Sequence, residues 1–205
     1  MLLASVADIR SKLGFDDMTD INFAITTALD AAESQLAGRL ETEFDQGAFV
    51  DTFYVREPPY LDGSAFETQF KLRRGLVASL TSVVYADTAA NLSVAGQYTD
   101  VTSMVQLHPD KGIVHDYQTP YFRKYVRISY QAGFAADPNN AESYLISSVP
   151  DWLQQAATLN CLIGMADSPV LSEAQIKLDT KVLGGQYDVL TARHLRFAPI
   201  SVPPL

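Results

Sequence analysis

The sequence is poor in the residues from which most catalytic and metal sites are built. Its 205 residues include one cysteine, Cys161, and three histidines. A single cysteine excludes an intrachain disulfide and a cysteine-rich zinc site. No apolar run approaches the roughly 20 residues that span a bilayer, and the first residues lack the basic region and apolar stretch of a signal peptide. The sequence therefore predicts neither a secreted disulfide scaffold nor a membrane protein.

Positive charge is also scarce. Fifteen Lys and Arg stand against 24 Asp and Glu, so the formal net charge is −9. This balance argues against affinity for the DNA backbone, which is bound by clustered Lys and Arg. The acids are concentrated between Asp16 and Asp51, where nine of them accompany a single base, Arg39.

Helical patterns open the chain. A short helix is predicted over residues 5–13, with Gly14 as its stop. A long helix is predicted from Thr19 to about Phe44, because apolar residues recur every three or four positions along one face. Phe23 falls on the opposite side of this helix, where an exposed phenylalanine can contact a neighbour.

Strand patterns follow, from residue 49 to about residue 133. Runs of β-branched and aromatic residues alternate there with turn sequences such as Pro109–Gly112. The predicted strands cover residues 53–56, 66–73, 80–86, 101–107, 113–116 and 125–130. Short strands at close spacing predict a mostly antiparallel β-region, inserted between helices.

Helix returns at Pro150, because proline is favoured at the first helical position. The segment from Trp152 to Ala166 is apolar on all sides, so it is expected to be central or to face another chain. A capping box at Ser172–Gln175 predicts a last helix that stops at Gly184–Gly185. Residues 186–205 are apolar, slightly basic and interrupted by prolines, which predicts an extended tail.

Together these patterns predict an α+β fold. It comprises an N-terminal helical hairpin with a long helix, an antiparallel β insertion, C-terminal helices and an extended tail. Residues 1–48 and 148–185 are expected to form a helical core, residues 49–147 the inserted β-region, and residues 186–205 a docking tail.

No catalytic constellation emerges from the sequence. It has no P-loop, no GxGxxG after a strand, no HExxH and no GxSxG. His108 and His115 could meet across a turn beside Asp110 and Asp116 and bind a metal, but two polar residues on a hairpin explain them better. Neither histidine has a nucleophile and an oxyanion site near it, and Cys161 lies among apolar residues as a buried, inert thiol would. We therefore predict no enzymatic activity, no metal and no cofactor.

A different class of function is suggested by one aromatic and basic segment. It comprises Tyr117, Tyr121, Arg123, Lys124, Tyr125, Arg127 and Tyr130. Such a patch could stack single-stranded nucleic acid, although strand residues with one packed face explain it better in an acidic chain. The alternative function is therefore a β-domain binding module, either a tail or stopper component or a binder of a host surface or nucleic acid.

Six motifs occur in an order that is itself informative. They are the helix Ile25–Leu40, Leu80–Tyr85, Tyr98–Asp100, Asp110–Val114, Val126–Phe134 and Val149–Ala156. In this order the chain resembles the head-to-tail connector (adaptor) proteins of tailed bacteriophages, especially the longer members with a β-insertion. The resemblance covers about residues 5–165. One departure lies at Leu162–Asp167, where similar proteins carry an aromatic and basic helix end.

The resemblance implies a structural protein of the virion neck, present in the host cytoplasm during assembly. Such adaptors form a cyclic homo-oligomer, typically a dodecamer, beneath the portal protein. The ring extends the DNA channel, offers a platform to the stopper or tail protein, and lets DNA pass without specific binding. Tail terminators and stoppers are alternatives in the same class, but they are dominated by β-structure, whereas this chain opens and closes with helices.

Three groups of residues are expected to carry this role. The portal-binding tail is expected to use Leu190, Leu195, Arg196, Phe197, Ile200 and Leu205. The protomer interface or the core is expected to hold Phe23, Trp152, Leu159 and Leu162. The lumen is expected to be lined by Asp20, Asp30, Glu33 and Glu41, since acids repel DNA phosphates.

Overall fold

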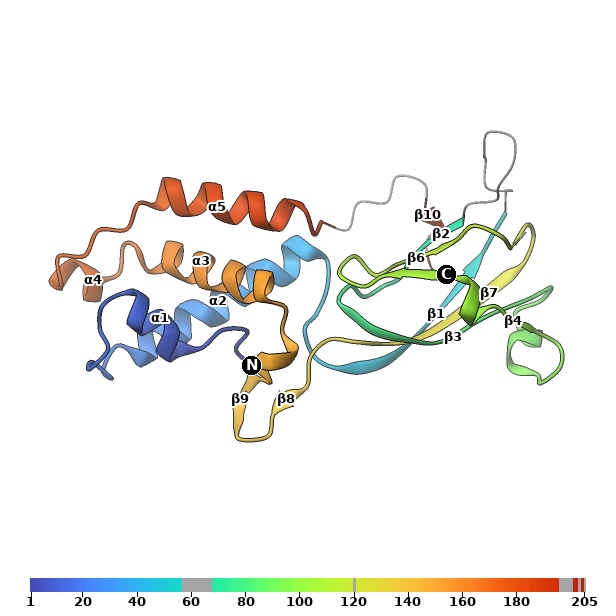
Figure 1. Ribbon diagram of the computed structural model, residues 1–205, viewed down its shortest axis with the longest axis horizontal. Coiled ribbons are helices and arrows are strands. Elements are labelled where there is room, and N and C mark those ends of the chain that lie inside the picture. The colour runs from blue at the N-terminus through green and yellow to red at the C-terminus, as the bar shows by residue number, and fades with distance from the viewer. Residues whose placement is uncertain (57–67, 120, 196–200, 203, 205) are drawn as a thin grey trace. The chain divides into compact units, whose positions relative to one another are not determined.

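The computed structural model describes residues 1–56, 68–119, 121–195, 201–202 and 204. The chain forms two compact units (Figure 1). A helical unit comprises residues 1–40 and 134–195, and a strand unit comprises residues 41–133 with the C-terminal strand. The α+β class predicted from the sequence is confirmed. No helix in the described part of the chain combines the length and the hydropathy needed to cross a bilayer.

Five helices and one small hairpin build the helical unit. The helices are α1 (Val6–Lys12), α2 (Asn22–Leu40), α3 (Asp151–Met165), α4 (Pro169–Glu173) and α5 (Thr180–Ala192), and the hairpin pairs β8 (Ala136–Asp137) with β9 (Asn140–Tyr144). Helix α3 packs against both α2 and α5. The prediction of a central helix after Pro150 is therefore confirmed.

Local signals define the first two helices. The hydroxyl of Ser5 accepts a hydrogen bond from the amide of Asp8 and caps α1, and Gly14, at φ +77°, follows its end. Helix α2 is shorter than predicted, beginning at Asn22 and ending at Leu40. It ends there because Glu41 has φ +50°, a left-handed conformation that does not continue a helix.

The α2–α3 contact combines apolar packing with one polar bridge. The apolar stripe of α2 is buried, including Ile25, Leu29 and Leu36. From α3, the side-chain amide of Asn160 donates to the carbonyl of Ala32 (3.2 Å) and to the side chain of Gln35 (2.9 Å). These bonds satisfy a buried amide and fix the register of the two helices.

The predicted end of the last helix at Gly184–Gly185 is wrong, because both glycines lie inside α5. The carboxylate of Asp179 caps this helix, and Tyr187 and Thr191 on its inner face are buried. Two glycines cost a helix roughly 2 kcal/mol relative to alanine. Burial of an aromatic side chain contributes about as much, so tertiary packing offsets the local penalty.

The capping box predicted at Ser172 is also wrong. Ser172 lies within the short helix α4 instead. The cap is Ser168, whose hydroxyl accepts from the amide of Leu171 (3.3 Å), and Pro169 occupies the first turn.

Two sheets form the strand unit (Figure 1). Its strands are β1 (Gly47–Tyr54), β2 (Thr68–Lys71), β3 (Val77–Ala86), β4 (Thr99–Asp100), β5 (Gln106–His108), β6 (Ile113–Asp116), β7 (Tyr125–Ala132) and β10 (Ser201–Val202). One sheet has the order β1-β7-β3-β4 and the other β10-β2-β6-β5, antiparallel except for β10 on β2. Phe53 from the first sheet and Phe70 from the second share one buried core, with ring centroids 5.1 Å apart.

Two segments differ from the predicted β-region. The strand expected over residues 101–107 is largely a 3₁₀ turn, because the carboxylate of Asp100 accepts from the amide and the hydroxyl of Thr102. Residues 134–147, which the predicted boundaries placed in the β insertion, cluster with the helices instead. There the amide of Tyr144 donates to the carbonyl of Leu2 (3.1 Å), which ties the hairpin to the N-terminal segment.

Candidate interaction surfaces

An apolar groove runs between α2 and α3. It has a volume of about 480 Å³ and is lined mainly by small or apolar side chains, among them Phe23, Ala24, Thr27, Ala28, Ala31, Ile163 and Gly164. Phe23 stands at its edge with 82% of its surface exposed. An exposed phenylalanine beside an apolar groove is typical of a surface that binds another protein.

A second groove, of about 610 Å³, lies between α3 and α5. Its apolar lining includes Leu159, Val182, Val189 and Leu190, and Lys181 and Arg193 also line it. Val182 and Val189 are 53% and 62% exposed. Helix α5 thus buries one face against α3 and presents a second apolar face to solvent.

An ion pair joins α5 to α2. Arg39 contacts the carboxylate of Asp188 (2.9 Å) and places its guanidinium over the ring of Tyr187, 5.0 Å from the centroid. Asp188 therefore already has a cationic partner. Lys181 and Arg193, by contrast, form no ion pair within the described part of the chain.

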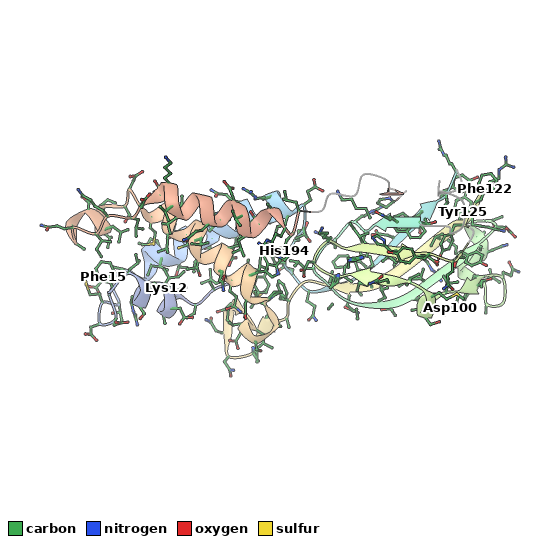
Figure 2. All side chains as sticks on the ribbon, turned by 45° about the horizontal axis from the view of Figure 1, so that its top comes forward. Lys12, Phe15, Asp100, Phe122, Tyr125 and His194 are labelled. Carbon is green, nitrogen blue, oxygen red and sulfur yellow. The ribbon has the colours of Figure 1, made fainter. Side chains whose placement is uncertain are left out.

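The four residues expected at the protomer interface or in the core occupy different environments. Phe23 is exposed, and Leu159 is half-buried in the α3–α5 groove. Leu162 is buried. Trp152 is half-buried and stacks on the imidazole of His194, with ring centroids 3.6 Å apart; His194 is labelled in Figure 2. Only Phe23 and Leu159 therefore contribute to the two grooves.

The acids expected at the lumen also occupy different environments. Asp20 and Asp30 are exposed, and Glu41 is exposed but forms an ion pair with Lys71 (2.7 Å). Glu33 differs from the expectation of a surface position, because it is only 8% exposed. It lies one turn from Leu29 on the inward face of α2, so the helical period that buries the apolar stripe buries Glu33 too.

Burial changes the chemistry of Glu33. Desolvation raises the pKa of its carboxyl from 4.5 to about 7, although the amide of Leu3, which donates to it, favours the charged form. The remaining acids of the N-terminal block include Asp16 and Asp17, which are exposed.

The expected tail residues are described only in part. Leu190 lies within α5 and is half-buried, and Leu195 is 36% exposed. Arg196, Phe197, Ile200 and Leu205 lie outside the described residues. Between Ile200 and Leu205, strand β10 pairs in parallel with β2, with Ser201 opposite Gln69.

The tyrosines of the aromatic and basic segment, considered above as an alternative binding surface, are only partly exposed. Tyr121 and Tyr130 are buried, and their hydroxyls donate to the carboxylates of Asp116 (2.5 Å) and Asp51 (2.9 Å). Burial, followed by the bond to Asp116, raises the pKa of the Tyr121 hydroxyl. Tyr125 (Figure 2) packs instead against another tyrosine of the sheet. Tyr121 and Tyr130 therefore belong to the core and Tyr125 is half-buried, as expected of strand residues with one packed face.

The two histidines do come together. The rings of His108 on β5 and His115 on β6 lie 4.5 Å apart. The neighbouring Asp116 is buried and accepts from the amides of Gln118 and Thr119, so it faces the interior. The described residues include no group of three or more His, Cys, Asp or Glu side chains that could hold a metal ion. As predicted, Cys161 is buried, which raises the pKa of its thiol to about 12.

The sequence analysis missed the exposed face of α5. The predicted stop at Gly184–Gly185 left Val189 and Arg193 outside the helix that carries Lys181 and Val182. The signal was present, since Val182 and Val189 are seven residues apart and so lie on one helical face.

Comparison with known proteins gave no family assignment. No protein-family model matches the chain. No curated protein matches it.

Among solved structures, a chain from the neck of an empty gene transfer agent (GTA) particle, computed with C6 symmetry, aligns over 96% of this chain and 91% of its own length, at 20% identity and a TM-score of 0.44. A chain from the neck of a native GTA particle, computed with C12 symmetry, aligns over 94% of this chain and 88% of its own length, at 20% identity and a TM-score of 0.44. A chain from the virion of a native GTA particle aligns over 90% of this chain and 89% of its own length, at 20% identity and a TM-score of 0.42. At these TM-scores the similarity carries no functional assignment.

Proposed function

We propose that this chain is a ring-forming head-to-tail adaptor of a phage-like particle. In this role it lies in the virion neck beneath the portal protein, assembles with copies of itself, extends the DNA channel and supports the stopper or tail. The role is structural rather than catalytic. It follows the resemblance of the six sequence motifs, and the observation that carries it is the surface of the helical unit, where Phe23 is 82% exposed beside one of two apolar grooves.

Ring formation explains this surface. A cyclic homo-oligomer closes through heterologous contacts, in which each protomer offers two different patches. Full exposure of a phenylalanine forfeits roughly 1.5–3 kcal/mol relative to burial. Two separate apolar grooves in one helical unit support this proposal, because they are two different patches on one protomer.

Portal binding is proposed for the residues that follow α5. Leu195, which follows the end of α5 at Ala192, is exposed. The sequence beyond Leu195 carries further apolar residues, Phe197 and Ile200. An extended apolar segment can dock onto a partner and become ordered on binding. Residues 186–192 belong to α5, so the proposed docking segment now begins near Leu195.

The lumen proposal is narrowed by the surroundings of the acids. Glu33 is buried and Glu41 is paired with Lys71, so neither supports it. Asp20 and Asp30 of the expected set are exposed and stay in the proposal, and Asp16 and Asp17 of the same acidic block are exposed too. Their replacement by lysine would attract DNA phosphates, and we expect slower DNA ejection from assembled particles at low salt. An unchanged rate of DNA ejection would contradict the proposal that these acids line the channel.

The decisive experiment mixes the purified chain with purified portal rings. Negative-stain images and the mass of the complex should reveal a second ring of this chain on the portal. A variant that ends at Leu195 should still form its helices, measured by circular dichroism, but should no longer copurify with the portal. If the complete chain neither binds the portal nor forms a ring, the adaptor function is refuted.

A further inference from the structure

We propose that copies of this chain join head to tail, with the Phe23 edge of α2 from one copy seated in the α3–α5 groove of the next. This inference rests on the proposed function and names the two surfaces that build its ring. The occupant of the groove is thus a second copy of this chain.

The apolar parts of the two surfaces suit each other. Phe23 projects from α2 with 82% of its surface exposed, and the α3–α5 groove has a volume of about 610 Å³. Val182 and Val189 are more than half exposed along this groove, and Leu159 completes its lining. Insertion of the Phe23 ring would therefore cover apolar side chains on both copies at once.

The charges around the two surfaces are complementary. Phe23 is preceded by Asp20 and followed, two helical turns later on the same face, by Asp30, and both are exposed. The groove is bordered by Lys181 and Arg193, which stand about 18 Å apart along α5. An apolar knob flanked by acids thus meets an apolar groove flanked by bases, which favours this pairing over contact between like surfaces.

The arrangement also predicts the symmetry of the contact. Phe23 lines the α2–α3 groove and is not among the residues of the α3–α5 groove. One contact therefore uses the knob of one copy and the groove of the other, leaving a free groove and a free knob. Such heterologous contacts propagate until the ring closes, whereas an isologous contact would stop at a dimer.

Cysteine cross-linking tests the contact directly. The only native cysteine, Cys161, is buried, so it leaves the background clean. A double variant, Phe23→Cys with Val189→Cys, is assembled on the portal and oxidised with copper phenanthroline. We expect a ladder of covalent multimers on a denaturing gel. Each single variant should stay monomeric, and a mixture of the two single variants should give dimers only.

Charge reversal provides a second test that keeps Phe23 in place. Asp30→Lys should raise the protein concentration needed for half-assembly about tenfold, because it places a cation against Lys181 and Arg193. Adding Lys181→Glu and Arg193→Glu should restore assembly. Lys12→Glu, an equal reversal at an exposed site on α1, should have no effect.

The outcomes separate this inference from the adaptor function. If wild-type rings form but the double variant gives no ladder and the charge reversals have no effect, the inference is wrong and the adaptor function stands. Dimers from Phe23→Cys alone would indicate an isologous contact, or pairing through the α2–α3 groove, and would also overturn it. A wild-type chain that stays monomeric beside the portal would overturn both.

Discussion

The buried carboxyl of Glu33 makes the free energy of unfolding of the helical unit depend on pH, and the sign of this dependence follows from its raised pKa. Burial raises its pKa from 4.5 to about 7. Between these two values the folded chain binds more protons at this site than the unfolded chain does. The free energy of unfolding must therefore fall as pH rises from about 4.5 to about 7, and this contribution is then constant.

The size of the effect follows from the same shift. One pKa unit corresponds to about 1.4 kcal/mol, so the stability lost through Glu33 across this range is about 3 kcal/mol. Glu33→Gln removes the titration and still offers an oxygen to the amide of Leu3, which bonds to the native carboxylate. We expect this variant to match the native chain near pH 4 and to exceed its stability by up to about 3 kcal/mol at pH 8.

The only tryptophan provides the assay. Trp152 lies in α3, so its fluorescence during urea unfolding reports on the helical unit. Unfolding curves at pH 4, 6 and 8 should separate the native and Glu33→Gln chains progressively. Asp17→Asn, which removes an exposed carboxyl of the same unit, serves as the control and should follow the native curve. A native chain equally stable at pH 5 and pH 7.5, or a Gln variant that is weaker at pH 8, would refute the reasoning.

Two further predictions concern the strand unit. Gly133→Ala should lower the free energy of unfolding by more than about 2 kcal/mol, because Gly133 has φ +82° and an added Cβ would lie 2.2 Å from the carbonyl oxygen of Asp45. The matched control is Gly96→Ala, which has φ +81° but lies in open space and should lose less stability. Equal losses would show that the approach to Asp45 is unimportant. Tyr121→Phe should cost about 1–2 kcal/mol in urea unfolding followed by circular dichroism, because it removes a buried hydrogen bond, whereas the exposed Tyr117→Phe should cost little. A Tyr121→Phe chain as stable as the native one would contradict this account.

The first two helices were predictable because their signals are local. The Ser5 cap and the positive φ of Gly14 bound α1, and the apolar stripe of α2 has a helical period. The C-terminal end of α2 was less predictable. It depends on Glu41, which adopts a left-handed conformation that its residue type does not announce.

Helix α5 could not be bounded from its own residues. Local rules place a stop at Gly184–Gly185, and a helix that contained them would be weak in isolation. Its persistence depends on Tyr187, buried within the unit, and on the contact of Arg39 with Asp188. Arg39 is separated from α5 by most of the sequence, so only the folded chain reveals the full length of α5 and its exposed face.

The alternation of faces along a strand explains why the aromatic and basic segment does not form one surface. Neighbours along a strand point to opposite faces, so residues an odd number of positions apart cannot share one face. Tyr125 and Tyr130 are five positions apart on β7, where half-buried and buried residues alternate strictly. Their odd spacing therefore places them on opposite faces of the sheet, and Tyr130 lies in the core.

Helix α2 breaks the usual arrangement of polar and apolar side chains twice, and the two exceptions have different causes. Glu33 is directed inward by the helical period, where the amide of Leu3 donates to its carboxyl and burial raises its pKa, so its polar group has a partner within the chain. Phe23 is directed outward, and no such internal contact covers its 82% exposed surface. An exception that the folded chain leaves unresolved is expected where a partner completes the structure, and the acids beside Phe23 favour a basic-edged surface such as the one on α5.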